Sequence, residues 1–430
     1  MDKLVFWECN EINFEYVKRY IASGKLSNWR DFIEKHGLFT THSENKYENL
    51  EPWIQWPTVR TGLNFSDHNL FRLGDSLHKD IKQHWELIEK KGYKVAAVSP
   101  INGINKTTSS PFWIPDPWVD TKTSGSNSIK RFASAIKQAV NDNAQGKLEL
   151  KTIFSLAEML IFSSQPSSWS SYIYNGLGAL RRRRWSKAII LDRLLTDTFM
   201  HMWKKHQPDF GTLFLNAGAH IQHHYLYSSS AYDGNVENPK WYIKSDRDPL
   251  LEVLELYDKV LCELNKLPNT RLMISIGMRQ IPYKEPIFYW RLKNHDAFLK
   301  KINIKYKSVK PRMTRDFLIE FEKKTEKEHA MCLLKSMTSQ DGQRIFNEID
   351  DKGLGLFVSL TYHHDISRDF KVRYGENKYL NFKDDVVFVA IKNGHHDSKG
   401  YYLDSYRQPG ELQDNIPLRN LFSYTMDHFN

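Results

Sequence analysis

The segment that decides the fold reads LFLNAGAHIQHHY, from Leu213 to Tyr225. Its first three residues form an apolar run typical of a buried strand, and nitrogen and oxygen donors follow at once. Asn216 and His220 stand four residues apart, and His220, His223 and His224 follow at spacings that share one face of a helix. Imidazole is a common ligand of zinc and related ions, and open α/β sheets bind ligands where their strands end. We therefore expect a functional site here; the alternative is that these polar residues only cover the start of a helix.

Other apolar runs along the chain end in the same way. The strand candidates besides Leu213–Leu215 are Leu4–Trp7, Val95–Val98, Leu272–Ile276 and Val386–Ala390. Polar residues follow these runs at Glu8, Gln280 and His396. An amphipathic helix over 77–91 precedes Gly92 and the strand at 95–98, an order that favours a parallel sheet. We predict an α/β three-layer sandwich, in which a mostly parallel sheet is flanked by helices and these polar residues converge on one cleft.

The strand and helix rhythm runs through all 430 residues, so we expect one large α/β domain over 1–430. Residues 130–205 look mainly helical and are predicted to be an insertion. Residues 296–350 are charged and are predicted to be a helical insertion or a lid.

The net charge of +10 makes anionic partners plausible. The run Arg181–Arg184 could meet phosphate, nucleic acid or an acidic glycan, or it could be a solvated loop. Three cysteines that lie far apart, Cys9, Cys262 and Cys332, indicate a reducing compartment. No apolar run is long enough to span a bilayer. We expect a cytoplasmic protein, and a peripheral association with a membrane is compatible with the sequence.

Several motifs, in this order, resemble the alkaline phosphatase superfamily and its type I phosphodiesterase and nucleotide pyrophosphatase branch. The motifs are the strand ending in Glu8, Trp56–Gly62 followed by Asp67-His68, Gly92–Pro100, Asn216 with His220, and His396 with Gly400. The resemblance covers nearly the whole chain. It implies the fold of that superfamily and chemistry on phosphate or sulfate esters.

Departures from the family pattern are equally clear. Pro52 stands where an ungapped comparison places the family's nucleophilic Thr or Ser, and Ile276–Gln280 lacks its Asp-His pair. Glu8 and Asn216 each replace an Asp, and a neutral amide is a weaker ligand of divalent metals than a carboxylate. The family's two-metal site therefore looks incomplete. We expect one divalent ion, zinc or manganese, held through Glu8, His220 and His396, or none.

The resemblance and the polar residues at strand ends give a set of candidate site residues. The catalytic candidates are Thr58, Thr61 and His68, and the metal candidates are Glu8, Asn216, His220 and His396. The substrate-binding candidates are Asn10, Gln55, Arg60, Arg72, Gln222, His223, His224, Arg279, Gln280 and His395. Guanidinium groups suit phosphate and sulfate oxygens, and amides suit sugar hydroxyls. The alternative for the threonines is that their hydroxyls only bond the loop backbone, and His68 could likewise be structural.

We therefore expect a divergent hydrolase or transferase of phosphate or sulfate esters, acting on a nucleotide-linked sugar, a glycan or a lipid-linked substrate. The missing nucleophile supports an alternative, a pseudoenzyme of the same fold that binds a glycan or nucleotide without turnover. A nucleic-acid binder rests on charge alone, because the sequence has no motif of that class. The oligomeric state is not indicated.

Overall fold

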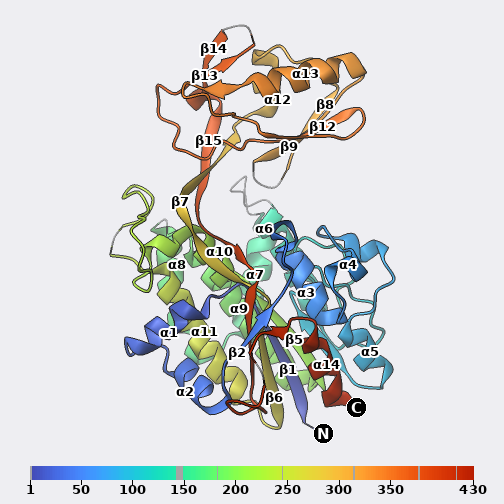
Figure 1. Ribbon diagram of the computed structural model, residues 1–430. Coiled ribbons are helices and arrows are strands. Elements are labelled where there is room, and N and C mark those ends of the chain that lie inside the picture. The colour runs from blue at the N-terminus through green and yellow to red at the C-terminus, as the bar shows by residue number, and fades with distance from the viewer. Residues whose placement is uncertain are drawn as a thin grey trace. The chain divides into compact units, whose positions relative to one another are not determined.

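The computed structural model describes residues 2–141, 149–181, 183–244, 246–312, 315–375, 378–412 and 414–430 (Figure 1). The chain forms two compact units where the sequence suggested one domain. The first unit comprises Met1–Asn235, Lys240–Pro282 and Gly394–Asn430, and the second comprises Val236–Pro239 and Tyr283–Asn393. Within the described residues, no helix has both the length and the apolar character needed to cross a membrane.

The first unit is built on an eight-stranded sheet. In spatial order its strands are β17 (Ile416–Pro417), β2 (Phe39–His42), β16 (Lys399–Asp404), β6 (Thr270–Ile276), β1 (Lys3–Cys9), β5 (Phe210–Leu215), β3 (Val95–Val98) and β4 (Trp113–Ile114). The strands from β6 to β4 are parallel to one another, and β16 runs antiparallel to β6 and β2. The predicted mostly parallel sheet is confirmed.

Both faces of this sheet are covered, which explains why its strands read as unbroken apolar runs. In β1, Val5 and Trp7 belong to one apolar core, while Leu4 and Phe6 belong to a second core on the other face, and all four side chains are fully buried. The layers are therefore helix, sheet and helix, as predicted.

Helices fill the two outer layers. Those that contribute to the core on the Trp7 face are α1 (Phe14–Ala22), α2 (Ser27–His36), α6 (Asn127–Asn141), α7 (Leu150–Ser163), α8 (Trp169–Leu180), α9 (Ser186–His206), α10 (Ala217–Tyr225) and α11 (Pro249–Asn265). Those on the Phe6 face are α3 (Pro52–Thr61), α5 (His84–Lys90) and α14 (Asn420–Met426). A short helix, α4 (Phe65–His68), follows α3.

Two local differences from the sequence prediction concern the Phe6 face. The helix predicted over 77–91 begins only at His84, where Glu86 caps it by accepting a hydrogen bond from the backbone N–H of Gln83 at 3.3 Å. The segment that contains Thr58 and Thr61, predicted as a loop, is helix α3. It begins with Pro52 in its first turn, where proline suits a helix because its missing N–H costs no hydrogen bond.

Among its described residues, the second unit consists of strands, two α-helices and a short 3-10 helix, η6 (Phe382–Asp384). Two strands lead the chain into and out of it, β7 (Arg279–Leu292) and β15 (Val386–Asp397), and they pair with each other. The helices are α12 (His295–Lys301) and α13 (Lys324–Ser336). The remaining strands form a sheet of β11 (Glu348–Asp351), β12 (Gly355–Ser359), β9 (Asp316–Glu320) and β8 (Ser308–Pro311), and another of β10 (Thr338–Ser339), β13 (Lys371–Tyr374) and β14 (Lys378–Asn381).

Residues 296–350, which we expected to be helical, are thus mixed. In β9 the side chains of Phe317 and Ile319 are buried while those between them are not, the alternation typical of a strand with one solvated face. The many charged residues of this segment occupy such solvated faces as well as helices. That the segment acts as a lid stays a prediction.

Candidate metal centre

Glu11 follows the carboxyl end of β1 in the first unit. Its backbone adopts φ 59°, a left-handed conformation that is uncommon for residues other than glycine and that clusters at functional sites. The side chain is buried, with 2% of its surface exposed. The turn therefore holds a carboxylate inside the protein, at the edge where the parallel strands end.

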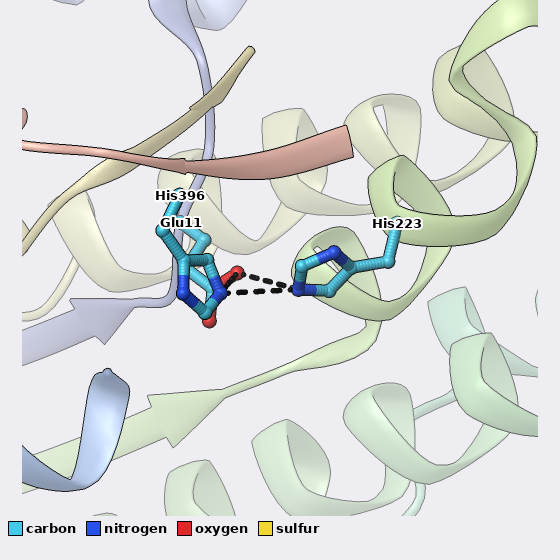
Figure 2. A group of neighbouring side chains, drawn as sticks. All are labelled: Glu11, His223 and His396. Carbon is cyan, nitrogen blue, oxygen red and sulfur yellow. Dashed lines mark hydrogen bonds and ion pairs between the residues drawn. The ribbon is translucent and has the colours of Figure 1, made fainter. Parts of the chain in front are cut away.

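Two histidines from distant segments approach this carboxylate (Figure 2). His223 lies on α10, the helix that follows β5, and His396 lies near the end of β15. Both side chains are largely buried, with 15% and 12% of their surface exposed. Three separate segments of the chain thus bring one donor group each to a single point.

The three donor atoms form a nearly equilateral triangle. Glu11 Oε2 lies 3.1 Å from His223 Nε2 and 3.2 Å from His396 Nε2, and the two nitrogens are 3.2 Å apart. Ligand atoms bound at 2.0–2.1 Å to a tetrahedral zinc ion stand about 3.3 Å from one another. The triangle therefore has the dimensions of one face of a tetrahedral metal site, and two imidazoles with one carboxylate are a ligand set that catalytic zinc uses.

Hydrogen bonds on the far side of the His223 ring decide which nitrogen is available. Its Nδ1 lies 2.8 Å from the carbonyl oxygen of Gly394, which can only accept, so Nδ1 must carry the proton. In the neutral ring Nε2 then presents a lone pair toward Glu11. This arrangement is the usual way a protein prepares a histidine for a metal.

His396 has a matching partner at its own Nδ1. Glu51 Oε2 lies 3.7 Å from this nitrogen, at ion-pair distance. Glu51 stands immediately before α3 and is about one third exposed. A carboxylate here favours the proton on Nδ1 and leaves Nε2 for a cation, so both histidines point their unprotonated nitrogens at the same place.

The charge of Glu11 is held by its surroundings. Burial alone would raise its pKa, but without a metal the neighbouring His396 and His223, when protonated, outweigh burial by charge attraction and hydrogen bonds and hold the pKa of this carboxyl well below its usual range. Glu11 is therefore ionised, as a metal ligand must be.

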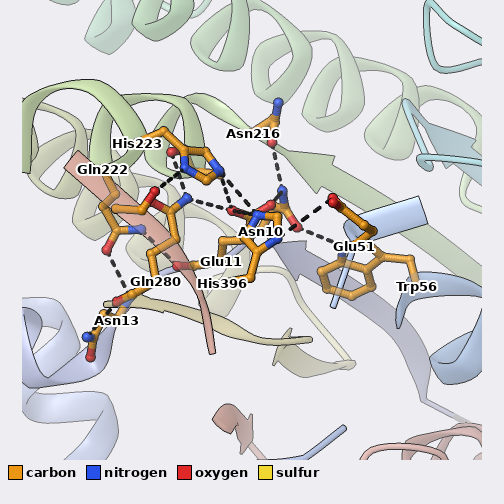
Figure 3. Close-up of polar contacts among 12 residues, drawn as sticks. Asn10, Glu11, Asn13, Glu51, Trp56, Asn216, Gln222, His223, Gln280 and His396 are labelled. Atoms are coloured by element: carbon orange, nitrogen blue, oxygen red, sulfur yellow. Dashed lines mark hydrogen bonds and ion pairs between the residues drawn. The ribbon is translucent and has the colours of Figure 1, made fainter. Parts of the chain in front are cut away.

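Amide side chains fix the two oxygens of Glu11 (Figure 3). Gln280 Nε2 donates to Oε2 at 2.5 Å and also to the carbonyl oxygen of Ala219 at 3.0 Å. Asn10 Nδ2 donates to Oε1 at 2.9 Å and to Asn216 Oδ1 at 2.8 Å. Such partners orient a ligand and are needed for tight metal binding.

A second pair of amides holds the turn that carries Glu11. Gln222 Nε2 donates to the carbonyl oxygen of Glu11 at 2.8 Å, and its Oε1 accepts from the backbone N–H of Asn13 at 3.0 Å. Asn13 Nδ2 in turn donates to the backbone oxygen of Gln280 at 2.9 Å. Figure 3 shows these contacts joining β1, α10 and β7. The left-handed turn is thus locked by neighbours on both sides.

The sequence placed a metal ligand at Glu8, and the structure gives this residue another partner. Side chains alternate along β1, so Glu8 shares the face of Leu4 and Phe6. There it forms an ion pair with Arg60 of α3, and both side chains are fully buried. Arg60 also donates to the carbonyl oxygen of Ile101, at 2.5 Å. Arg60, expected at the substrate, therefore serves this buried pair.

The predicted catalytic residues lie in and beside α3, where their side chains form local hydrogen bonds. Thr61 Oγ1 donates to the carbonyl oxygen of Pro57 at 2.7 Å, within the helix. His68 Nδ1 accepts from the backbone N–H of Leu70 at 3.0 Å, so in the neutral ring its Nε2 carries the proton and donates to Thr58 Oγ1 at 3.1 Å. Burial lowers the pKa of His68 to about 4. The ring is therefore not arranged to accept a proton from Thr58.

The remaining predicted residues divide between the centre and its surroundings. Asn10, Gln222, His223, Gln280 and His396 meet at Glu11, and Asn216 contacts Asn10. His220 is exposed and its ring contacts His224. Arg279 pairs with Asp397, Gln55 donates to the carbonyl oxygen of Asn49, His395 contacts Tyr47, and Arg72 is exposed. Glu11 and Glu51 were not among the sequence candidates.

No family model matches the sequence, and no curated protein matches it. Solved structures do match. Phosphonoacetate hydrolase from Sinorhizobium meliloti 1021, in complex with phosphonoacetate, is 11% identical with a TM-score of 0.46, over 100% of this chain and 96% of that one. Murine ectonucleotide pyrophosphatase/phosphodiesterase 5 is 11% identical with a TM-score of 0.41, over 100% and 95%. Alkaline phosphatase from the Antarctic bacterium TAB5 is 10% identical with a TM-score of 0.41, over 100% and 99%. All three are members of the superfamily that the sequence motifs resemble.

Proposed function

We propose that this protein is a metal-dependent hydrolase or transferase of phosphate esters that uses a single divalent ion. The observation that carries the proposal is the triangle of Glu11, His223 and His396, with edges of 3.1 to 3.2 Å. The motif resemblance found in the sequence supports the same class of chemistry.

The ligand set and its partners suit a borderline metal. Two imidazole nitrogens and one carboxylate oxygen favour zinc, and manganese is the other candidate. A divalent ion bound here would polarise a phosphoryl oxygen and lower the pKa of a bound water molecule. Glu11, His223 and His396 bind it, Gln280 and Asn10 orient Glu11, and Gly394 and Glu51 orient the two rings.

The attacking group in this proposal is water or an acceptor hydroxyl rather than a threonine of the protein. Thr61 is hydrogen-bonded within α3, and the Thr58 hydroxyl accepts a hydrogen bond from His68. Glu51 is the carboxylate beside His396 that is partly open to solvent, which suits it to take a proton from an incoming hydroxyl. The substrate is an anionic ester, and its leaving group could be a nucleotide, a sugar or a lipid-linked glycan.

The test combines metal content with turnover. The purified protein is stripped with a chelator, titrated with ZnCl2 or MnCl2, and assayed on p-nitrophenyl phosphate and bis(p-nitrophenyl) phosphate. We expect stoichiometric binding of one ion and metal-dependent release of nitrophenol. His223→Ala and His396→Ala should each lower turnover by about 100-fold or more, because each removes one of three protein ligands.

His220→Ala is the matched control, since His220 lies on the same helix but is exposed. This variant should retain metal binding and turnover. Loss of metal in His220→Ala with retention in His223→Ala would contradict the proposed ligand set. Unchanged turnover in a His223→Ala, His396→Ala double variant would contradict the function itself.

One observation favours a second candidate, a protein that binds an anionic glycan or nucleotide without turnover. Neither threonine of α3 is arranged as a nucleophile, and Pro52 stands where the family has one. Metal-dependent binding of AMP in calorimetry, with no hydrolysis of either nitrophenyl ester, would support this candidate over the enzyme.

A further inference from the structure

Helices α7 and α8 of the first unit expose an unusual number of large apolar side chains. Among the described residues, ten of the nineteen exposed large apolar side chains lie between residues 150 and 180. They are Leu150, Ile153, Phe154, Ile161, Phe162, Trp169, Ile173, Tyr174, Leu177 and Leu180, which we call the apolar face. Soluble monomers seldom expose contiguous apolar patches larger than about 300–600 Å², and larger ones mark protein or membrane contacts.

Both helices carry large apolar side chains on their exposed sides. In α8, the buried side chains are Tyr172 and Asn175, with Gly178, whereas Trp169, Ile173 and Leu177, spaced four residues apart, are exposed. In α7, Met159 is buried in the core, yet Phe154 and Ile161 are exposed as well, and Phe162 packs partly on His201 of α9. An ordinary surface helix keeps its exposed side polar.

Polar contacts hold both helices in this orientation against α9. Tyr172 OH and Ser168 Oγ donate to Asp197 at 2.7 Å and 2.9 Å, and Ser163 Oγ lies 3.3 Å from Thr198 Oγ1. Both helices thus pack on α9, and the exposed apolar side chains of each lie on its solvent side.

The charges around this surface are one-sided. Residues 150–180 contain only two charged side chains, Lys151 and Glu158, in a chain that is 26% charged. Glu158 is already paired with Arg131. The run Arg181–Arg184 follows Leu180 directly, and no acidic residue occurs between Glu158 and Asp192. The described guanidinium of Arg183 lies over the ring of Tyr174, 4.8 Å from its centre.

We propose that the apolar face docks on the surface of an anionic lipid bilayer. The stripes would enter the boundary between headgroups and acyl chains, where Trp169 and Tyr174 suit the interface, as amphipathic helices do when they lie in its plane. The arginines at the end of α8 would meet the phosphates of anionic lipids. This inference does not depend on the metal centre, so it can fail while the proposed function holds.

The test is flotation of the purified full chain with vesicles of phosphatidylcholine, with and without phosphatidylglycerol. We expect the protein to float with the anionic vesicles and to be partly released by high salt. A Phe154→Ser, Leu177→Ser double variant should lower the partition coefficient by about tenfold or more, because each side chain loses several buried methylene equivalents. An Arg181→Gln, Arg184→Gln variant should have a partition coefficient lower by about fivefold for each arginine replaced, on anionic vesicles only.

The matched control is Leu354→Ser with Tyr379→Ser, two side chains of the second unit that are exposed to a similar degree, 53% and 59%. This variant should float like the unaltered protein. Since all substituted side chains are exposed, the melting temperature should not change. Failure of the unaltered protein to bind anionic vesicles overturns the proposal. So does a dimer in light scattering that the Phe154→Ser, Leu177→Ser variant splits without any vesicle binding, because the face would then belong to a second copy of the chain.

Discussion

His223 and His396 present their Nε2 atoms to each other at 3.2 Å, and one oxygen of Glu11 lies 3.1 Å and 3.2 Å from the two nitrogens. Nδ1 of His223 donates to a backbone carbonyl, so the lone pair of its Nε2 faces an anionic oxygen unless a cation is shared among the three atoms. A proton can satisfy two of them at a time, whereas a metal ion satisfies all three. This difference is the basis for proposing a metal ion at this point.

Glu11 and Glu8, three residues apart, should respond differently to the same substitution. Glu11→Gln removes a metal ligand, so we expect zinc affinity to fall by about 100-fold or more with little change in the stability of the metal-free protein. Glu8→Gln leaves Arg60 buried without a counter-charge, so we expect it to cost about 3–5 kcal/mol of unfolding free energy and to leave zinc affinity unchanged. Calorimetric titration and urea unfolding measure the two effects.

If Glu8→Gln folds poorly, a second variant still shows whether Glu8 binds zinc. Replacing both members of the buried pair, as Glu8→Leu with Arg60→Met, removes both charges and should recover most of the lost stability. The double variant should bind zinc normally. If it folds but binds no zinc, Glu8 is a ligand after all and the triangle around Glu11 is not the metal site.

Gln280 should tune the centre without belonging to it. Its Nε2 donates to Glu11 Oε2 at 2.5 Å, so Gln280→Leu should weaken metal binding by about 10- to 100-fold. Gly394→Ala should act in the same direction, because a Cβ there would lie 2.5 Å from Gln280 Oε1. Gly176→Ala, at a helical position with nothing within 4 Å of the added carbon, is the control and should leave affinity unchanged. Equal affinities in all three variants would show that Gln280 does not position Glu11.

The fold could be predicted from the sequence because buried parallel strands appear in it as continuous apolar runs. β1, β3, β5 and β6 are covered on both faces, so each reads as an apolar run. The strands of the second unit are harder to recognise in the sequence. Its antiparallel strands have solvated faces, and their charged residues resemble those of a surface helix.

The site was predicted only in part, for reasons that lie in register and in tertiary contacts. The apolar run before Glu8 suggested that the strand ends there, but β1 continues to Cys9, and alternation turns Glu8 toward Arg60. The first acidic residue beyond the strand is Glu11, a signal that was present in the sequence. No such signal in the sequence favours His223 over His220. The role of His223 depends on the carbonyl of Gly394, a residue 171 positions away.

Thr58 should contribute little to catalysis. Its hydroxyl accepts a hydrogen bond from His68 Nε2, and the Thr61 hydroxyl donates one to the carbonyl oxygen of Pro57 within α3. We expect Thr58→Ala and Thr61→Ala to lower kcat by less than about tenfold, far less than loss of a metal ligand. Because burial lowers the pKa of His68 to about 4, this ring stays neutral above pH 5 and should add no step to the pH profile of kcat there. Trapping a phosphorylated threonine at either position by mass spectrometry would contradict this expectation.

His84 should make the protein sensitive to acid. The ring is fully buried among Phe6, Trp85 and Phe210, and neither of its nitrogens has a hydrogen-bond partner among the described residues. Burial, with a smaller contribution from Arg60, holds the pKa of His84 well below its ordinary value of 6.5. The folded protein therefore keeps this ring neutral, while the unfolded chain takes up a proton below pH 6.5.

Stability from a group whose folded pKa is depressed is present above the unfolded pKa and is lost as pH falls below it. One such proton costs about 1.4 kcal/mol per pH unit, or about 2 kcal/mol between pH 6.5 and pH 5. We expect His84→Leu to be at least as stable at pH 7, since it removes two unsatisfied polar atoms, and to lose about 2 kcal/mol less on acidification. Urea unfolding at pH 7 and at pH 5 measures the difference. His329→Leu, at an exposed position of α13, is the control. The same loss of stability on acidification in His84→Leu and in the unaltered protein would assign the acid sensitivity to other groups.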